Sequence, residues 1–167
     1  QAFSIDDSQT TEIDDALSVR GLGTGTVIVG IHIAAPALAL TPGSPVDQLG
    51  RTRLSTVYMP GFKITMLPDA VVQSYTLQEG RNCPAVSLYL TLDEATLALR
   101  ASETRLERVP IAANLRHDQL DAVVTVPWLE DPAHQPAGDI PAAAQALDAA
   151  RRAELSFLYR LAYQRKA

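Results

Sequence analysis

The stretch Ile5-Asp6-Asp7-Ser8-Gln9-Thr10-Thr11-Glu12-Ile13-Asp14-Asp15-Ala16-Leu17 decides how this sequence is interpreted. It carries five carboxylates within the ten residues from Asp6 to Asp15. So dense a cluster repels itself unless cations or hydrogen-bond donors neutralise it. Hard oxygen ligands at short spacing suit Mg²⁺, with Mn²⁺ as a second possibility. Two such ions about 4 Å apart could activate water and stabilise the leaving oxygen in phosphodiester cleavage.

The cluster also has a purely structural interpretation, a solvated acidic turn before a strand, and composition alone does not decide between the two. In an extended backbone Glu12 and Asp14 share one side and Asp15 takes the other. A turned backbone over residues 8–11 would bring Asp6 back beside them. An EF-hand loop is a poorer match, since glycine is missing at its sixth position and glutamate at its twelfth. The sequence contains neither a Walker phosphate loop nor a serine or cysteine nucleophile motif.

Length and composition predict one folded domain. The chain has 167 residues, of which 47% are hydrophobic and 20% charged, so intrinsic disorder is excluded. No run approaches the roughly 20 apolar residues that a membrane span needs, so we expect no membrane partner. The formal net charge is -5, and residues 1–20 carry most of it, with five carboxylates against Arg20. The sequence has no basic face, which argues against a simple electrostatic groove for nucleic acid.

The cysteine count and the two ends of the chain bear on location and domain organisation. Cys83 is the single cysteine and cannot form an internal disulfide, and no signal peptide opens the chain, so we expect a cytoplasmic protein. The sequence begins with Gln1 and stops at Ala167 within a helical pattern. We therefore expect it to be part of a longer protein.

Hydrophobic periodicity predicts an α+β fold, a mixed sheet with hairpins and flanking helices. The predicted strands are 2–5, 16–20, 26–33, 85–92 and 96–109. A glycine-rich turn at 21–25 joins one hairpin, and residues 93–95 join another. The predicted helices are 46–53, 69–72, 118–124 and a long terminal helix within 141–167. Proline-rich residues 36–45 and 127–141 are predicted to be loops, and 58–62 a turn.

Three motifs, in order, resemble the ribonuclease II and ribonuclease R family, whose catalytic module is the RNB exoribonuclease domain. The first is the acidic stretch, which resembles the family's pattern of Asp, five residues, Asp, any residue, then Asp-Asp-Ala. The second is His32-Ile33-Ala34. The third comprises Arg53-Leu54-Ser55-Thr56-Val57-Tyr58-Met59-Pro60 and Met66-Leu67-Pro68. The resemblance spans essentially the whole chain and implies that residues 1–167 are the N-terminal part of one RNB domain, the rest of which lies beyond them.

The resemblance implies a metal-dependent 3′→5′ exoribonuclease that degrades single-stranded RNA processively to 5′-monophosphate nucleotides. Carried over, Asp6, Glu12, Asp14 and Asp15 form the catalytic set around Mg²⁺. Asp6 and Asp15 would hold one ion and Glu12 would complete the second site. Asp14 would be needed most, because it would position the metal-bound water.

The resemblance also implies two RNA-binding residues. Tyr58 would stack on the 3′-terminal base, an interaction that tolerates any sequence. Arg53 would contact the RNA backbone. The structural alternatives are a turn tyrosine packed on Pro60 and a solvated charge at a helix end. For His32 we favour a partly buried, hydrogen-bonded histidine over an RNA contact. Small RNA-binding barrels of the cold-shock or S1 type are expected outside these residues.

Two departures from the family pattern leave an alternative function open. Glu12 stands where the family usually has Asp, and Ala35 stands where the second motif normally continues with Asp. The family's arginine-bearing segment and the second aromatic of its base clamp would lie beyond Ala167, so we expect this chain alone to be weak or inactive. The alternative is a degenerate RNB-like domain that binds RNA or a protein partner without cleavage. An unrelated α+β domain with an acidic turn is the third interpretation.

Overall fold

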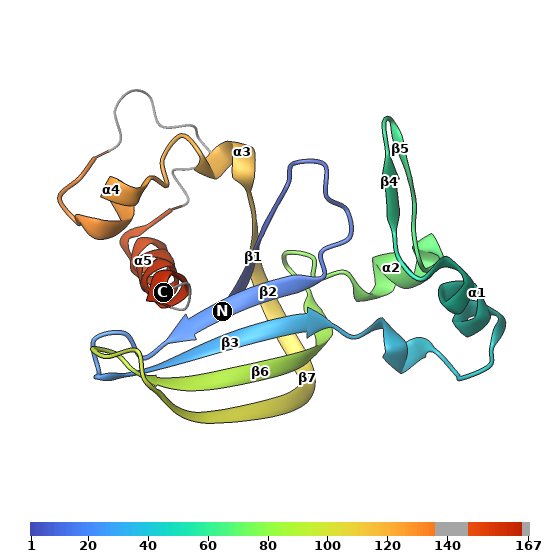
Figure 1. The fold of residues 1–167 in the computed structure, drawn as a ribbon, viewed down its shortest axis with the longest axis horizontal. Helices are drawn as coiled ribbons and strands as arrows, with labels where there is room; N and C mark the ends of the chain where they lie inside the picture. Colours follow the sequence, from blue (N-terminus) through green and yellow to red (C-terminus); the bar gives the residue numbers. More distant parts are fainter. Residues whose placement is uncertain (136–146, 165–167) are drawn as a thin grey trace.

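Five strands form the centre of the molecule and close into a barrel (Figure 1). The computed structural model describes residues 1–135 and 147–164. The strands run in the order β1 (Ala2–Asp6), β2 (Asp15–Arg20), β3 (Thr26–Ala34), β6 (Asn82–Asp93) and β7 (Leu99–Arg116). The predicted class is confirmed, because a mixed sheet built of hairpins carries helices on its flanks.

The barrel closes through one parallel pair of strands, β1 and β7. In this pair Phe3 lies opposite Ala113 and Asp6 lies opposite Arg116. All other neighbours, β1–β2, β2–β3, β3–β6 and β6–β7, are antiparallel. Closure of the barrel was not predicted, because this pairing joins the two ends of the barrel sequence and leaves no local signal.

The first hairpin, β2–β3, turns where the glycines predicted it. Gly21, Gly23 and Gly25 have φ angles of 86°, 80° and 82°, a region that side chains other than glycine rarely adopt. The backbone N–H groups of Gly23 and Gly25 donate to the Glu94 carboxylate at 2.7 and 2.9 Å. Glu94 lies in the β6–β7 turn, so the two hairpin turns are fastened to each other.

The remaining elements lie at two sides of the barrel (Figure 1). On one side are the 3₁₀ helix η1 (Pro36–Ala39), α1 (Pro45–Arg53), the small sheet of β4 (Val57–Met59) and β5 (Phe62–Ile64), and α2 (Asp69–Tyr75). On the other are α3 (His117–Leu120), α4 (Val126–Glu130) and α5 (Ala149–Gln164). No helix among these described elements is long and apolar enough to cross a bilayer.

Several predicted boundaries were wrong. The predicted loop 36–45 contains η1, and the predicted loop 127–141 begins inside α4. Proline is tolerated in a first helical turn because its missing N–H has no partner there, and the Thr125 hydroxyl caps α4. The predicted turn 58–62 carries paired strands, and the helix predicted over 118–124 ends at Leu120. The terminal helix predicted within 141–167 is confirmed over Ala149–Gln164, and residues 141–146 and 165–167 lie outside the described residues.

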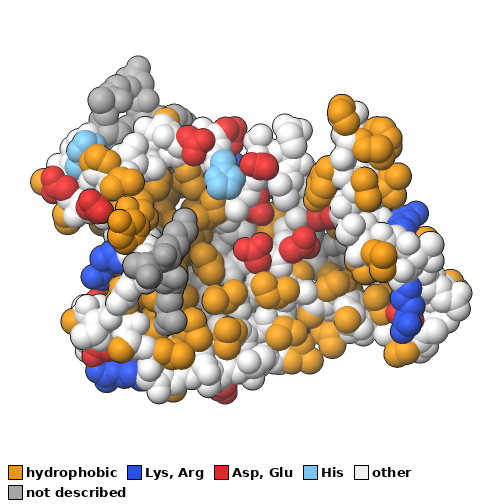
Figure 2. Space-filling model, in the orientation of Figure 1, with side chains coloured by type: hydrophobic (Ala, Val, Ile, Leu, Met, Phe, Trp, Pro, Cys, Tyr) orange, Lys and Arg blue, Asp and Glu red, His pale blue; other side chains and the backbone are white. Residues whose placement is uncertain are grey.

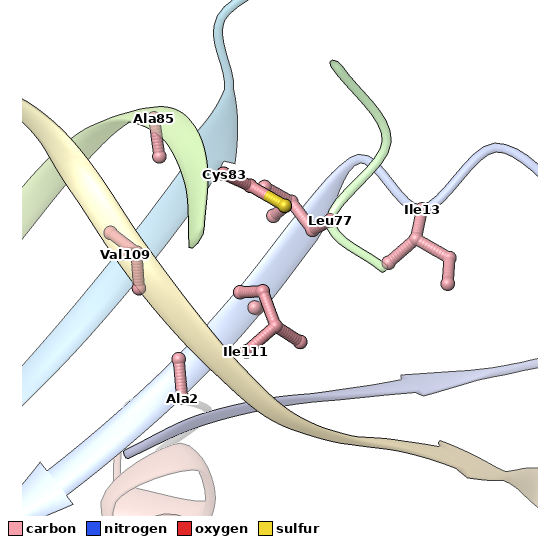
Figure 3. Close-up of a cluster of buried hydrophobic side chains, with 8 residues drawn as sticks. Ala2, Ile13, Leu77, Cys83, Ala85, Val109 and Ile111 are labelled. Atoms are coloured by element: carbon pink, nitrogen blue, oxygen red, sulfur yellow. The ribbon is translucent and has the colours of Figure 1, made fainter. Parts of the chain in front are cut away.

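The hydrophobic core directly behind the acidic stretch brings β1, β2, β6 and β7 together (Figure 3). Leu77 and Cys83 are almost fully buried there, beside Ile13 of the acidic stretch. The rest of the cluster is Ala2, Ala16, Ala85, Val109 and Ile111. A second buried cluster fixes α5, whose Phe157 packs with Val27, Val29 and Leu92. The acidic stretch is therefore anchored in the packed core through Ile13 and Ala16, and Ile13 holds Glu12 and Asp14 on either side of it in place.

Candidate active site

The acidic stretch links the end of β1 to the start of β2. Asp6 is the last residue of β1 and Asp15 is the first of β2. These strands are antiparallel, so both carboxylates lie at the same end of the barrel. Between them the backbone turns, with the Thr10 N–H donating to the Asp7 carbonyl at 3.0 Å. The Arg116 guanidinium donates to the carbonyls of Asp7 and Thr10 at 2.9 and 3.2 Å and holds the turn against the end of β7.

Ile13 fixes the direction of the two central carboxylates. Its side chain is buried, its N–H donates to the Thr76 hydroxyl at 2.8 Å, and its carbonyl accepts from the Leu77 N–H at 2.9 Å. Because side chains alternate along an extended backbone, Glu12 and Asp14 both point away from this core. The Asp14 carbonyl accepts from the Ala34 N–H at 2.8 Å, which fixes the following residue as well.

Glu12 is a buried carboxylate with one satisfied oxygen. Its side chain is only 8% exposed. Oε2 accepts a hydrogen bond from the Thr56 hydroxyl at 3.0 Å. Oε1 has no hydrogen-bond partner within the described residues, and the Lys63 ammonium lies 3.6 Å away. A buried, half-satisfied carboxylate is costly, so this oxygen is chemically suited to receive a cation.

Asp14 experiences the charge of the whole cluster. Loss of solvent raises the pKa of its carboxyl, and the charges of Glu12, Asp15 and Asp6 raise it further. Lys63 acts in the opposite direction and lowers that pKa. The four acidic residues singled out in the sequence therefore share one electrostatic site. Perturbation of this kind is typical of functional sites.

The residues present fit a divalent cation by the chemistry of their donor atoms. The donor set is carboxylate oxygen, which Mg²⁺ and Mn²⁺ prefer, and the unsatisfied Oε1 of Glu12 belongs to it. Asp6 and Asp15 frame the set at the strand ends. Within residues 1–135 and 147–164, no three acidic, histidine or cysteine side chains converge on one point, and Asp6 accepts from the Ser4 hydroxyl at 2.5 Å. Holding an ion would thus require the carboxylates to turn towards one another.

A cavity of about 360 Å³ opens beside Glu12 and Asp14. The rest of its lining includes an aromatic wall, which we define as the side chains of Tyr58, Tyr75 and Met66. The volume lies in the range of about 300–1,000 Å³ that small ligands occupy. Figure 2 shows acidic side chains gathered between the barrel and the β4–β5 side of this face, with the visible Lys and Arg at the two ends. A flat ring can therefore lie next to the carboxylates.

The two predicted RNA-binding residues differ in their relation to this cavity. Tyr58 lies on β4, lines the cavity and is 70% exposed. Arg53 ends α1, donates to the Thr65 carbonyl at 2.7 Å and is not among the lining residues. His32 is buried, and its two ring nitrogens bond the hydroxyls of Ser18 and Ser87 at 2.9 and 2.8 Å. The interpretation of His32 as a hydrogen-bonded histidine is confirmed, and its side chain is fully rather than partly buried.

Three residues of the site were missed by sequence reasoning. Thr56 stood within the third motif but was given no role, although it holds Glu12. Tyr75 lines the cavity from the end of α2, and nothing in its local sequence indicates this. Lys63 reaches Thr11 and Glu12 from β5. Its one available signal was the rarity of lysine, which occurs in this chain only at positions 63 and 166.

Solved structures with a similar fold are exoribonucleases and a relative of them. Ribonuclease R of Mycoplasma genitalium, in complex with ribose-methylated single-stranded RNA, matches with a TM-score of 0.73 and 17% identity, covering 98% of this chain and 24% of that one. Yeast Ssd1, described as a pseudonuclease, matches with a TM-score of 0.69 and 26% identity, covering 81% of this chain and 16% of that one. The fold is that of an exoribonuclease-type domain.

The sequence matches the RNB domain over residues 1–166, and the chain belongs to the RNB family. The predicted membership of the ribonuclease II and ribonuclease R family is thereby confirmed. A curated relative, the chloroplastic and mitochondrial ribonuclease II of Arabidopsis thaliana, is 38% identical over 93 residues, which are 55% of this chain and 12% of that protein. The chain thus spans about an eighth of this relative's length. The RNB family contains hydrolytic exoribonucleases and also the pseudonuclease type.

Proposed function

We propose that this chain carries the metal site of a 3′→5′ exoribonuclease that hydrolyses single-stranded RNA processively to 5′-monophosphate nucleotides. One observation carries the proposal: Glu12, with its unsatisfied buried oxygen, and Asp14, whose pKa is raised by burial and by the neighbouring carboxylates, line the same cavity as Tyr58. An acidic wall repels a phosphate unless cations stand between them. The arrangement therefore suits a polyanionic substrate only together with divalent ions.

Each residue has a role in this proposal. Asp6, Glu12, Asp14 and Asp15 would hold Mg²⁺ or Mn²⁺, which supplies positive charge at the phosphate and activates water for attack. Thr56 keeps the Glu12 carboxylate oriented through its hydrogen bond. Asp14 orients the attacking water. Tyr58 stacks on the terminal base within the cavity, and Arg53 contacts the RNA backbone outside it.

The lining of the cavity also supports a further part of the proposal, that this chain has low activity by itself. No lysine or arginine is among the residues that line it in the described part of the chain. Positive charge placed at the reacting phosphate is a large contribution to catalysis. We therefore expect the missing charge to come from other residues of a longer protein. The further RNA-binding barrels and the cytoplasmic location stay predictions.

A non-cleaving RNA- or protein-binding domain is the second candidate. Two observations favour it: the likeness to the pseudonuclease Ssd1 at 26% identity, and Glu12 where the family pattern has Asp. The extra methylene of glutamate displaces the carboxylate oxygens relative to those of aspartate. The intact acidic set argues for cleavage, because self-repelling carboxylates are of no use to a domain that only binds a polyanion.

The deciding experiment follows a 5′-labelled single-stranded oligoribonucleotide over time with Mg²⁺. The longest available form of the protein is compared with its Asp14→Asn variant and with Asp7→Asn, an exposed neighbour outside the proposed set. We expect shortening from the 3′ end with the unmodified protein and with Asp7→Asn. Asp14→Asn should abolish cleavage and keep RNA binding. Unchanged cleavage by Asp14→Asn would overturn the assignment, and an inert protein that still binds RNA would favour the second candidate.

A further inference from the structure

One ammonium group stands among the carboxylates of the candidate site. Lys63 of β5 donates to the Thr11 hydroxyl at 2.9 Å, and its Nζ lies 3.6 Å from the unsatisfied Oε1 of Glu12. The same Nζ lies 6.0 Å from the centre of the Tyr58 ring. The side chain of Lys63 is 27% exposed, so the charge is partly withdrawn from water. Lys63 thus contacts the acidic stretch and lies within cation–π range of Tyr58.

The β4–β5 hairpin delivers this charge in a fixed position. Lys63 is the cross-strand neighbour of Tyr58, with the tight turn at Pro60 and Gly61 close by. Thr56, directly before β4, bonds the other oxygen of Glu12. The two oxygens of Glu12 therefore face the same hairpin, one through a hydroxyl and one through an ammonium. The separation of 3.6 Å is too long for a hydrogen bond, so the ammonium acts on Oε1 through its charge.

We propose that Lys63 is an internal counter-cation that neutralises Glu12 until a divalent ion takes that oxygen and displaces the ammonium towards the Tyr58 ring. The inference rests on the proposed function, since it assumes a cation site at these carboxylates. The Lys63 ammonium and a divalent cation bound at Oε1 of Glu12 would repel each other strongly, because this oxygen is partly withdrawn from water. Displacement costs Lys63 one hydrogen bond, to Thr11, and the face of Tyr58 is an alternative position for a cation.

Two consequences follow for the site. Lys63 is a positioning residue that weakens divalent-ion binding by competition. It also couples ion binding to base binding, because the displaced ammonium moves towards Tyr58, the residue proposed to stack on the terminal base. Lys63 contributes no atom to the reaction in this scheme.

The first test measures Mn²⁺ binding by isothermal titration calorimetry and by Mn²⁺ electron paramagnetic resonance, without RNA. Lys63→Met is compared with the unmodified protein and with Arg51→Met. Arg51 is an exposed cation of α1 paired with Asp47, so both variants lose one positive charge. We expect Lys63→Met to bind Mn²⁺ about tenfold more tightly, from the lost repulsion, and Arg51→Met to match the unmodified protein. Equal or weaker binding by Lys63→Met overturns the proposal.

The second test needs no variant at position 63, so misfolding of Lys63→Met cannot obscure it. The chain has lysine only at positions 63 and 166. Acylation with an N-hydroxysuccinimide ester, read by peptide mass spectrometry, gives the labelling ratio of Lys63 to Lys166 with and without Mn²⁺. We expect Mn²⁺ to raise this ratio about threefold or more, because the displaced ammonium becomes more accessible. A ratio that stays the same or falls overturns the proposal.

The outcomes separate this inference from the proposed function. Mn²⁺ binding that is lost in Asp14→Asn, but is the same with and without Lys63, rejects the counter-cation and keeps the metal site. Absence of Mn²⁺ binding in the unmodified protein and in Lys63→Met rejects both.

Discussion

The Thr56 hydroxyl donates a 3.0 Å hydrogen bond to Oε2 of Glu12 across 44 positions of sequence. This bond fastens the small β4–β5 sheet to the acidic stretch at the end of the barrel. The same hydroxyl oxygen accepts from the Met66 N–H at 3.1 Å, so Thr56 also holds the residue that leaves the hairpin. Thr56 therefore helps to fix the position of the hairpin that carries Tyr58 relative to Glu12.

Replacing Thr56 with Val should destabilise the protein. The change leaves both oxygens of a buried carboxylate without a hydrogen bond, which costs about 1–3 kcal/mol of unfolding free energy. Thr56→Ser keeps the hydroxyl and is the matched control. Urea unfolding followed by the fluorescence of Trp128 measures the difference. A Thr56→Val midpoint equal to that of Thr56→Ser would show that the hydrogen bond is not important for stability.

Replacing Tyr58 with Ala should weaken RNA binding. Base stacking on an aromatic side chain is worth about 1–3 kcal/mol, or roughly 5- to 150-fold in the dissociation constant. Tyr58→Phe should retain most of the affinity, because the ring remains. Phe62→Ala is the control, since Phe62 is exposed on the paired strand but does not line the cavity. Fluorescence anisotropy with a labelled oligoribonucleotide, in the Asp14→Asn background, gives the values. Equal losses for Tyr58→Ala and Phe62→Ala would contradict a specific stacking role.

The stability of the protein should fall in mild acid because of His32. Burial lowers the pKa of this imidazole, and the opposing charge of Glu107 only partly offsets it. Below about pH 6.5 the imidazole of His32 takes up a proton in the unfolded chain but stays neutral in the folded one. The free energy of unfolding therefore decreases as the pH falls below that value. His32→Gln, which has no side-chain group that titrates in this pH range, should show a smaller decrease. Urea midpoints at pH 7.5, 6.0 and 5.0 test this against the exposed control His117→Gln. A pH slope that His32→Gln leaves unchanged would refute the assignment.

Replacing Leu54 with Gly should stabilise the protein. Leu54 directly follows α1 with a φ of 64°, and the Ser55 N–H donates across it to the Arg53 carbonyl at 2.8 Å, a strained three-residue turn. Backbone strain of this kind costs about 1–3 kcal/mol of folding free energy, which glycine would relieve. Glycine also has more conformational freedom in the unfolded chain, and this reduces the stabilisation by about 0.5–1 kcal/mol. Leu54 is 77% exposed, so little burial is lost. We expect a higher thermal midpoint for Leu54→Gly and a lower one for Leu38→Gly, a control with negative φ. A lower midpoint for both would contradict the strain.

The sequence predicted those parts of the fold whose causes are local. The hairpin β2–β3 follows from a glycine turn beside a β-branched run, and the acidic set is a cluster already in sequence. Parallel pairing of β1 with β7 has no such signal, since it joins Ala2 to Ile111. In the site, Thr56 and Lys63 come to the acidic stretch from 44 and 52 positions away. Contacts of this range depend on how the whole chain packs, which periodicity does not describe.

The clamp of Arg116 on the acidic turn has a consequence for the order of events on the ribosome. Asp7 and its neighbours are made early, but the guanidinium that holds their carbonyls is made 109 positions later. The strand that ends at Arg116 is also the one that closes the barrel against β1. We therefore expect the turn that carries the carboxylates to reach its final position only after β7 has been made, because both the clamp and the closing strand come from β7.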